Sequence, residues 1–447
     1  MLDLIVYLKQ DFNKTKNMSN LFTNYFSLLN QTDIQYAITG RTENYPEQIH
    51  SDIDIIIPHK QYHLFWEFMR SIKQNQLHWI QTIAHESTAF YNIVTLSENG
   101  FHIILKPDVC SDYYRNGQLF LKADYLLENR IYNKKGFFQL SPDKEFIYYL
   151  LKKIDKQYIN EDHFVHLHDQ WRQNKQECND MLVSFFSEKS QLIITDSIEG
   201  EDFSLFNKNI EHLQQELHKH LKFRIKECLE RIKNRLSRFV KPTGLIIVFM
   251  GPDGCGKTTI INGIKPDISE IFRKTKQYHL FPKDGKANTE PVTNPHSQKP
   301  RGYIGSFVKL CYLLYLYMTG YWCKIFLQKI KSTFVIFDRY FHDLIVDPKR
   351  YRHKSGTGLL KFIAIFIPKP DIWILLDASA EIIQQRKSEV SFEETTRQVI
   401  AYRQLFSNLK NSYIINANRS VNEIIYEVED IIIRYLESRT QKRYNTL

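Results

Sequence analysis

The sequence predicts an α/β protein in which two α/β domains are joined by a helical connector, and three observations lead to this prediction. An apolar run at 245–250 is followed by a glycine-rich turn and a helix start, which is typical of a parallel sheet with helices on both faces. Residues 1–140 alternate strand and helix patterns, whereas 141–241 carry mostly helical ones. Since 447 residues exceed one ordinary core, we expect domains at 1–140, 141–241 and 242–447.

The first domain is predicted to be a small α/β domain. Its patterns indicate helices over 18–29 and 62–72 and strands at 36–39, 53–57 and 101–105. In the connector, Ser141 and Pro142 form a strong helix start, with serine as N-cap and proline at the first helical position. One long amphipathic helix is predicted over 211–239, and its basic C-terminal half suits either solvent or an anionic bilayer surface.

The last domain is predicted to contain a parallel sheet. Its further strands are expected at 334–337, 372–376 and 413–416, its last helix at 421–436 and a long loop at 282–302. Residues 307–326 are apolar and aromatic and approach the length of a membrane-spanning helix. Because a span there would split one domain, we expect a buried helix or peripheral membrane contact.

The run from Gly251 to Thr259 fits the pattern of a phosphate-binding loop. Glycines let the backbone N–H groups surround a triphosphate, and the following helix N-terminus favours anions. Lys257 is expected to reach the β- and γ-phosphates of ATP, and the Thr258 hydroxyl to bind Mg²⁺. The nucleotide-binding residues predicted from this run are Gly251, Asp253, Gly254, Cys255, Gly256, Lys257, Thr258 and Thr259.

Charged residues follow two later strands of the same domain. Asp338 and Arg339 come directly after the strand at 334–337, so they are expected at the carboxyl edge of the sheet, where ligands bind. Asp338 is a candidate for holding Mg²⁺ or orienting an acceptor, and Arg339 suits a phosphate. Asp377 ends the next strand, and the segment with Arg386 and Lys387 follows it as a candidate lid.

These three motifs, in this order, resemble the thymidylate kinase family over roughly residues 243–437. The resemblance implies that Asp253 touches the acceptor's sugar and that Arg339 holds its phosphate. It also implies that Arg386 stabilises the transferred group and that the segment with Asn416 and Ala417 borders the adenine. The catalytic residues expected on this basis are Lys257, Asp338, Arg339, Arg386 and Asp253.

The chain departs from that family around the expected acceptor site, at 341–352 and in a long insertion at 282–330. It is most similar to the thymidylate-kinase-like proteins associated with surface polysaccharide assembly in bacteria. The acceptor is therefore expected to be a nucleoside monophosphate or a sugar or glycan end. Five residues of the first segment are either substrate-binding groups or members of local charge pairs: His342, Asp343, Asp347, Arg350 and Arg352.

The first domain resembles a nucleotidyltransferase of the polymerase-β type over about residues 18–130. Asp52 and Asp54 alternate on one strand, so their carboxylates share a face, and Asp108 is the candidate third carboxylate of a two-metal site. The family usually has Gly-Ser or Gly-Gly where this chain has Gly40 and Arg41. An active transferase and a site that binds without reacting both remain open.

The composition narrows the expected partners. The net charge is +10, but no nucleic-acid-binding motif is present, so no specific nucleic acid partner is expected. Six scattered cysteines and an N-terminus without a signal-peptide pattern suggest a cytoplasmic protein, with possible contact to the inner membrane surface and a possible homodimer. The sequence thus predicts an ATP- and Mg²⁺-dependent phosphotransferase. The alternatives are a nucleotidyltransferase regulated by its phosphate-loop domain and a nucleotide-switched scaffold on a membrane surface.

Overall fold

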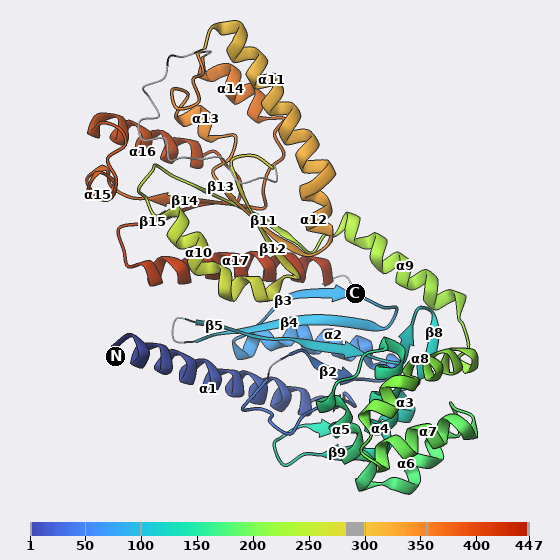
Figure 1. Ribbon diagram of the computed structural model, residues 1–447. Helices are drawn as coiled ribbons and strands as arrows, with labels where there is room; N and C mark the ends of the chain where they lie inside the picture. Colours follow the sequence, from blue (N-terminus) through green and yellow to red (C-terminus); the bar gives the residue numbers. More distant parts are fainter. Residues whose placement is uncertain are drawn as a thin grey trace. The chain divides into compact units, whose positions relative to one another are not determined.

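The computed structural model describes residues 2–49, 51–98, 101–282, 299, 301–354 and 356–444, with the side chains of 2–15, 98, 101 and 220 excepted. The chain forms two compact units, one of Met1–Leu236 with Glu437–Leu447 and one of Ser237–Leu436. The predicted α/β class is confirmed. The first unit has a mixed eight-stranded sheet, and the second has an all-parallel five-stranded sheet (Figure 1).

The sheet of the first unit runs in the order β3-β4-β6-β2-β1-β10-β9, with β5 paired to β4. Its strands are β1 (Ala37–Thr39), β2 (Ile53–Ile56), β3 (Leu77–Ala84), β4 (Ala89–Glu98), β5 (Phe101–Leu105), β6 (Pro107–Cys110), β9 (Ile131–Tyr132) and β10 (Phe138–Gln139), and β7 (Tyr113–Arg115) and β8 (Gln118–Leu121) form a separate hairpin. Helices α1 (Leu2–Asn30), α2 (Tyr62–Ser71) and α3 (Ala123–Leu126) complete this part.

The strands predicted at 36–39, 53–57 and 101–105 are confirmed, and the sheet contains further strands that were not predicted. The long antiparallel pair β3–β4 was not predicted from the sequence because polar residues are buried in it. Thr82 donates to the side chain of Asn92 at 2.6 Å, and Thr95 donates to the backbone oxygen of Ile103 at 2.7 Å. These bonds satisfy the polar groups inside the sheet, so alternation of apolar residues was not required there.

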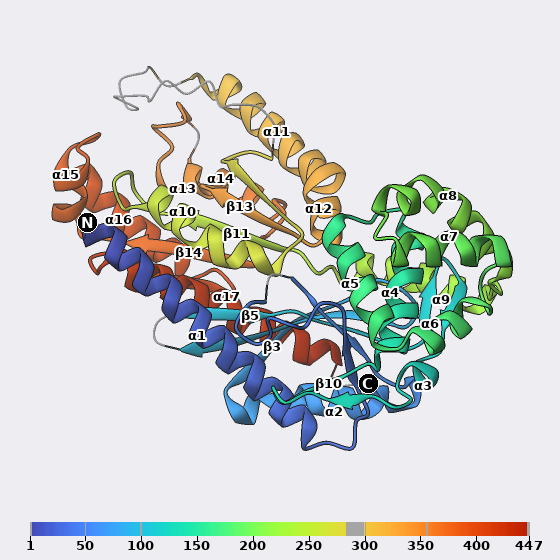
Figure 2. The ribbon, with the colours of Figure 1, turned by 60° about the horizontal axis from the view of Figure 1, so that its bottom comes forward.

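Five helices follow and gather in one cluster (Figure 2). They are α4 (Pro142–Lys156), α5 (Glu161–Gln173), α6 (Lys175–Leu182), α7 (Glu188–Glu199) and α8 (Phe203–His220). As predicted, α4 begins with Ser141 as N-cap and Pro142 in its first turn. Phe146, Trp171 and Phe206 are buried in the shared core of this cluster.

The single helix predicted over 211–239 is wrong. Helix α8 ends at His220, and a separate helix α9 covers Ile225–Val240. Between them the chain pairs with the β7–β8 turn, since Arg224 N donates to Gly117 O at 2.8 Å and Leu119 N donates to Lys222 O at 3.4 Å. The break separates two environments, because Leu213 and Leu217 are fully buried in the helical core whereas α9 lies outside it.

The second unit has the strand order β12-β13-β11-β14-β15. Its strands are β11 (Leu245–Met250), β12 (Lys274–His279), β13 (Thr333–Asp338), β14 (Ile372–Asp377) and β15 (Ser412–Asn416), so the predicted strands and their parallel pairing are confirmed. Helices α10 (Lys257–Ile268) and α17 (Val421–Tyr444) lie on one side of this sheet, and α11 (Tyr303–Gly320) and α14 (Thr357–Ala364) lie on the other (Figures 1 and 2). The remaining helices are α13 (Asp343–Val346), α15 (Ala380–Arg386) and α16 (Phe392–Phe406). The helix predicted over 421–436 continues to Tyr444, and the loop predicted at 282–302 lies largely outside the described residues.

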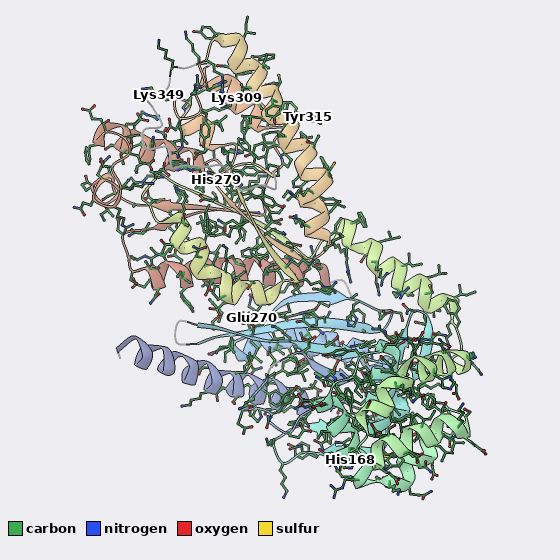
Figure 3. The ribbon with its side chains drawn as sticks, viewed as in Figure 1. His168, Glu270, His279, Lys309, Tyr315 and Lys349 are labelled. Carbon is green, nitrogen blue, oxygen red and sulfur yellow. The ribbon has the colours of Figure 1, made fainter. Side chains whose placement is uncertain are left out.

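The apolar segment predicted at 307–326 lies within a helical run of α11 (Tyr303–Gly320), a π-helical turn (Tyr321–Ile325) and α12 (Phe326–Ile330). One face of α11, with Leu310, Leu313 and Tyr317, is buried in the core of the second unit. The opposite face is exposed, and Tyr315, labelled in Figure 3, is 63% exposed there. Within the described part of the chain, Tyr303–Ile330 is the one helix long and apolar enough to cross a membrane, which is weak evidence by itself.

Candidate active site

The loop predicted to bind phosphate connects the C-terminal end of β11 to the N-terminus of α10. All six residues of β11 are buried, and the loop begins at Gly251 with φ of 142°. A Cβ atom at Gly251 would lie 2.8 Å from the backbone oxygen of Leu376 and 2.8 Å from the sulfur of Cys255. Because β14 packs directly against the loop and the backbone has a positive φ here, only glycine fits at this position.

Lys257 is the first residue of α10, and its side chain folds back over the loop. Its Nζ atom donates to the backbone oxygens of Gly251 and Pro252, both at 2.8 Å. The residue is buried, so its ammonium group is held by the loop itself. A bound triphosphate would offer this ammonium stronger, charged partners at the position that the loop has already set.

A cavity of about 530 Å³ lies over the loop. Of the predicted site residues, it is lined by Asp253, Gly254, Cys255, Gly256, Lys257, Thr258, Thr259, Asp338, Arg339, Arg386 and Ala417. Gly251 and Asn416 are not among the lining residues. Five further residues that were not predicted from the sequence also line the cavity: Ile260, His279, Arg419, Val421 and Ile424. His279 ends β12, and a rule that inspects the residue at the end of every parallel strand would have found it.

Asp338 and Thr258 are the candidate magnesium ligands beside the loop. Among the described residues, the buried Oδ1 atom of Asp338 has no hydrogen-bond partner, and its Oδ2 lies 3.9 Å from His279 Nδ1. A carboxylate oxygen left in this state next to a phosphate loop fits a hydrated Mg²⁺ ion. The described residues contain no group of three or more His, Cys, Asp or Glu side chains that could hold a metal by themselves. An ion here would therefore depend on the nucleotide's phosphates and on water.

The carboxylate of Asp253 lies between two guanidinium groups. Arg339 donates to one of its oxygens and Arg350 to the other. Burial opposes the charged carboxylate, but the charges of Arg339, Lys257 and Arg350 hold the pKa of Asp253 well below its ordinary value. Asp253 is thus a fixed anion in this cavity.

Arg339 is held on its other side as well. It is 3% exposed, has φ of 70°, and donates to Asp343 Oδ2 at 2.6 Å. Asp343 is fully buried and also accepts from Tyr351 at 2.6 Å and from Tyr402. Most donors of Arg339 are therefore engaged within the protein, and Arg350 is the more accessible cation on this side.

The charged segment 341–352 is mostly a set of local pairs. His342 is buried with its ring 4.7 Å from that of Trp373, and burial lowers its pKa to about 4. Asp347 accepts from the side chain of Gln398 at 3.1 Å, and Arg352 donates to the backbone oxygen of Lys299 at 3.0 Å. Of the five candidate residues in this segment, only Arg350 lines the cavity over the loop.

The end of α15 and the end of β15 meet at the far side of the cavity. Arg386 donates to the backbone oxygen of Ala417 at 3.4 Å, and Ala417 N donates to Asp377 O at 2.8 Å. The side chain of Asp377 forms an ion pair with Arg403 through both of its oxygens at 3.0 Å. Asp377 therefore supports α16, whereas Arg386 remains within reach of a ligand.

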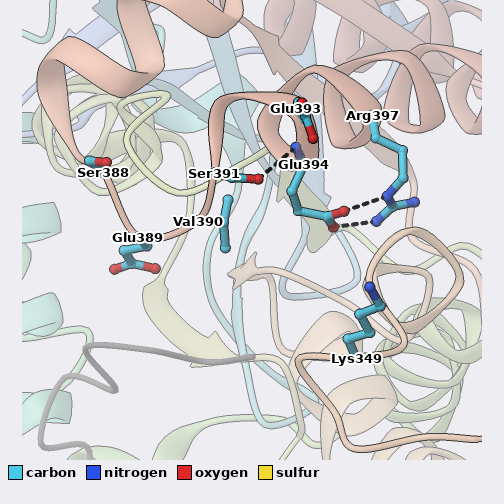
Figure 4. Close-up of a pocket in the computed structure, with 8 residues that line it drawn as sticks. All are labelled: Lys349, Ser388, Glu389, Val390, Ser391, Glu393, Glu394 and Arg397. Carbon is cyan, nitrogen blue, oxygen red and sulfur yellow. Dashed lines mark hydrogen bonds and ion pairs between the residues drawn. The ribbon is translucent and has the colours of Figure 1, made fainter. Parts of the chain in front are cut away.

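A neighbouring cavity of about 770 Å³ lies between the segment 388–397 and Lys349 (Figure 4). Glu389, Glu393 and Glu394 contribute three carboxylates to it, and Glu394 pairs with Arg397 at 2.6 Å. A small cavity bordered by Asp253, Arg350 and Glu389 shares residues with both larger ones. The small cavity therefore lies between the two large ones, beside Asp253.

The first unit has its own polar cavity, of about 180 Å³, which contains the predicted Asp52, Asp54 and Asp108. Asp54 and Asp108 are direct partners in the parallel pairing of β2 and β6. Burial, followed by the charges of Asp108 and Asp54, raises the pKa of Asp52. Lys152 donates to Asp54 at 2.6 Å, and His85 Nε2 lies 2.9 Å from Asp108 Oδ1. The three carboxylates line one cavity as predicted, but the ammonium group of Lys152 from α4 occupies the position beside Asp54 where a metal ion would bind.

Neither a protein-family model nor a curated protein matches this chain.

Proposed function

We propose that the protein is an ATP- and Mg²⁺-dependent phosphotransferase with a P-loop fold of the thymidylate kinase-like type. The observation that carries the proposal is the convergence of Lys257, Asp338 and Arg386 on one cavity over the loop. They come from three separate segments and meet at the carboxyl edge of a parallel sheet, where α/β proteins bind ligands. The first unit is, on this proposal, a nucleotidyltransferase-like domain.

In the proposed reaction, an acceptor oxygen attacks the γ-phosphorus of ATP. The bond to the β–γ bridging oxygen breaks, and ADP leaves with that electron pair. When the attacking oxygen belongs to a hydroxyl group, its proton passes to water or to one of the carboxylates that line the acceptor cavity. The loop N–H groups, Lys257 and Arg386 neutralise charge on the phosphates, and Asp338 and Thr258 would hold a magnesium ion, which would supply further positive charge there. Catalysis is then mainly positioning and electrostatic stabilisation.

The neighbouring cavity is the proposed acceptor side. Lys349 and Arg397 line this cavity together with its three carboxylates, and Glu389 pairs with Lys387 while Glu394 pairs with Arg397. Such a mixture of hydrogen-bond donors and acceptors suits an acceptor with several hydroxyl groups, so a sugar or glycan end is the favoured acceptor. Arg350 borders the small cavity between the two large ones, and there it would orient the attacking group.

The test is phosphate transfer from ATP with Mg²⁺ to a panel of nucleoside monophosphates, sugars and short glycans. Lys257→Ala should lower turnover by roughly 10²–10³-fold. Lys265→Ala is the matched control, because Lys265 bonds Asn262 and Gln277 on the exposed side of α10. Transfer to thymidine monophosphate alone would overturn the sugar assignment, and the absence of any Lys257-dependent transfer would overturn the phosphotransferase.

A nucleotidyltransferase reaction in the first unit is the second candidate, favoured by the shared cavity of Asp52, Asp54 and Asp108. Two metal ions would have to displace Lys152 from Asp54. The two candidates release different products, since nucleotidyl transfer releases pyrophosphate and phosphoryl transfer releases ADP. Pyrophosphate release that is lost in Asp54→Ala and kept in Lys257→Ala would identify the first unit as the working enzyme.

A further inference from the structure

Helix α9 packs on the first unit through its polar side. Asn234 donates to the backbone oxygen of Glu86 at 3.0 Å. Arg231 donates to the side chain of Asn116, and its Nε lies 3.9 Å from a carboxylate oxygen of Glu86. This is the reverse of the usual arrangement, in which the apolar face of a surface helix covers the core.

The apolar side of α9 consequently faces outward. Ile225, Leu229, Ile232 and Leu236 follow the spacing of one helical face and are 69%, 59%, 44% and 59% exposed. Phe239 and Val240 extend this stripe and are exposed too. The helix, all of it within the described part of the chain, has no buried residue. A continuous exposed apolar stripe of this kind on a protein surface indicates a contact with a membrane or with another molecule.

The charges beside the stripe are basic. At 100° per residue, Lys226 and Lys233 lie along one edge of the apolar face and Arg235 along the other, whereas Glu227 and Glu230 lie on the polar side. The segment 222–241 carries eight Lys and Arg residues and two Glu residues. Apolar side chains flanked by cations on an amphipathic helix match the boundary between anionic headgroups and acyl chains.

We propose that α9 lies in the interface of an anionic bilayer, with the Leu229–Leu236 side inserted and the flanking cations at the headgroups. A second copy of the chain fits this stripe poorly, because two α9 helices would bring like charges together. A nucleic acid would satisfy the cations but leave the apolar stripe in water. The bilayer is the partner that satisfies both features at once.

The second unit carries an independent apolar stripe on α11. Ile304, Val308, Tyr312 and Tyr315 are each more than half exposed on the face opposite its buried one. Trp322, in the π-helical turn that follows α11, is also more than half exposed. Tyrosine and tryptophan suit the headgroup level because one end of each ring system is apolar and the other is polar. Each unit thus presents one element that suits a membrane surface, and both are open to test separately.

The experiment is sedimentation of the full chain with vesicles of phosphatidylcholine alone and of equal parts phosphatidylcholine and phosphatidylserine. The wild type should bind the anionic vesicles at least about tenfold more tightly, and the difference should shrink as salt rises. The double variant Leu229→Gln with Leu236→Gln should weaken this binding by about tenfold or more. Leu192→Gln is the matched control, since Leu192 is 61% exposed on α7 of the same unit.

Four outcomes would overturn the proposal: equal binding to both vesicles, no binding to either, wild-type binding by the double variant, or a wild-type dimer that the double variant dissociates. Tight binding of an oligonucleotide that survives the double variant would assign the cations to nucleic acid instead. Since α9 lies outside both candidate catalytic cavities, ATP turnover in solution should be equal in wild type and double variant. A loss of turnover would indicate misfolding of the double variant. The milder double variant Lys226→Gln with Lys233→Gln would then be used in the same sedimentation experiment, and unchanged binding to anionic vesicles would overturn the proposal.

Discussion

Arg339 at the end of β13 donates from its guanidinium group to the carboxylate of Asp253 in the phosphate loop, 86 residues earlier in the chain. The same carboxylate accepts from Arg350. The loop that would bind ATP is therefore joined directly to the cations on the proposed acceptor side. A change at Asp253 should affect both sides of the site.

Asp253→Asn should destabilise the second unit by roughly 1–3 kcal/mol at neutral pH, because Arg339 and Arg350 lose a buried anion. The lowered pKa of Asp253 means that its charge stabilises the fold above the carboxyl's unfolded pKa of about 4 and ceases to do so as pH falls through the lower folded pKa. Urea unfolding between pH 7 and pH 3 measures the free energy of unfolding of wild type and variant. The difference between the two free energies should shrink below about pH 4. The exposed Asp196→Asn should cost little, and a pH-independent difference would contradict the assignment.

Arg350→Gln should impair the acceptor rather than the nucleotide. Because Arg350 borders the small cavity between the two large ones, we expect kcat/KM for the acceptor to fall roughly 10–100-fold. The Kd for ATP should rise much less, since Lys257 keeps its own bonds to Gly251 and Pro252 when Arg350 is replaced. Arg352→Gln is the control, as Arg352 bonds a backbone oxygen outside the cavity. Equal losses for ATP and acceptor would place Arg350 on the nucleotide side.

Gly251→Ala should disrupt the phosphate loop. Its φ of 142° is rare for residues with a side chain, and the new Cβ would lie 2.8 Å from the backbone of β14. We expect a loss of roughly 1–3 kcal/mol in stability and a marked loss of ATP affinity, measured by urea unfolding and by calorimetric titration. Gly358→Ala in α14 should be neutral or slightly stabilising, because nothing lies within 4 Å of that Cβ position. Normal ATP binding by Gly251→Ala would show that the loop tolerates another path.

His166 should stabilise the first unit at neutral pH, and this contribution should be lost at alkaline pH. Burial favours its neutral form, but hydrogen bonds to Glu145 and Glu43 prevail and raise its pKa from 6.5 to about 9. The protonated form therefore contributes fully below pH 6.5, and its contribution is lost as pH rises through 9. The size of that contribution is roughly 3 kcal/mol.

The measurement is urea unfolding of wild type and His166→Gln at pH 6 and pH 10. The wild type should lose stability between the two pH values, and His166→Gln should lose much less. Glu145 also accepts from the backbone N–H of Gly40 at 2.9 Å, so the same variant reports on the contact between α4 and the β1 turn. His63→Gln, at an exposed position of α2, should behave like the wild type. Parallel losses in wild type and His166→Gln would refute the assignment.

Local patterns predicted the second unit well. Continuous apolar runs identified β11, β13 and β14, and the glycine-rich run marked the loop between β11 and α10. The first unit was less predictable because buried polar residues such as Thr82 and Asn92 broke the alternation of its strands. The helix over 211–239 was predicted as continuous because its periodicity does continue, while the pairing of Arg224 with Gly117 that interrupts it joins distant parts of the chain.

By itself, the sequence determined the α/β class, the glycine-rich turn between β11 and α10 and the residues at the strand ends, because each depends on neighbours within a few positions. Only the tertiary structure decided which charges meet. The pairs of Asp253 with Arg350 and of Asp54 with Lys152 span 97 and 98 residues, and no local spacing encodes them. The outward apolar face of α9 was decided in the same way, since periodicity reveals that a helix has two faces but packing alone selects the one that meets the protein.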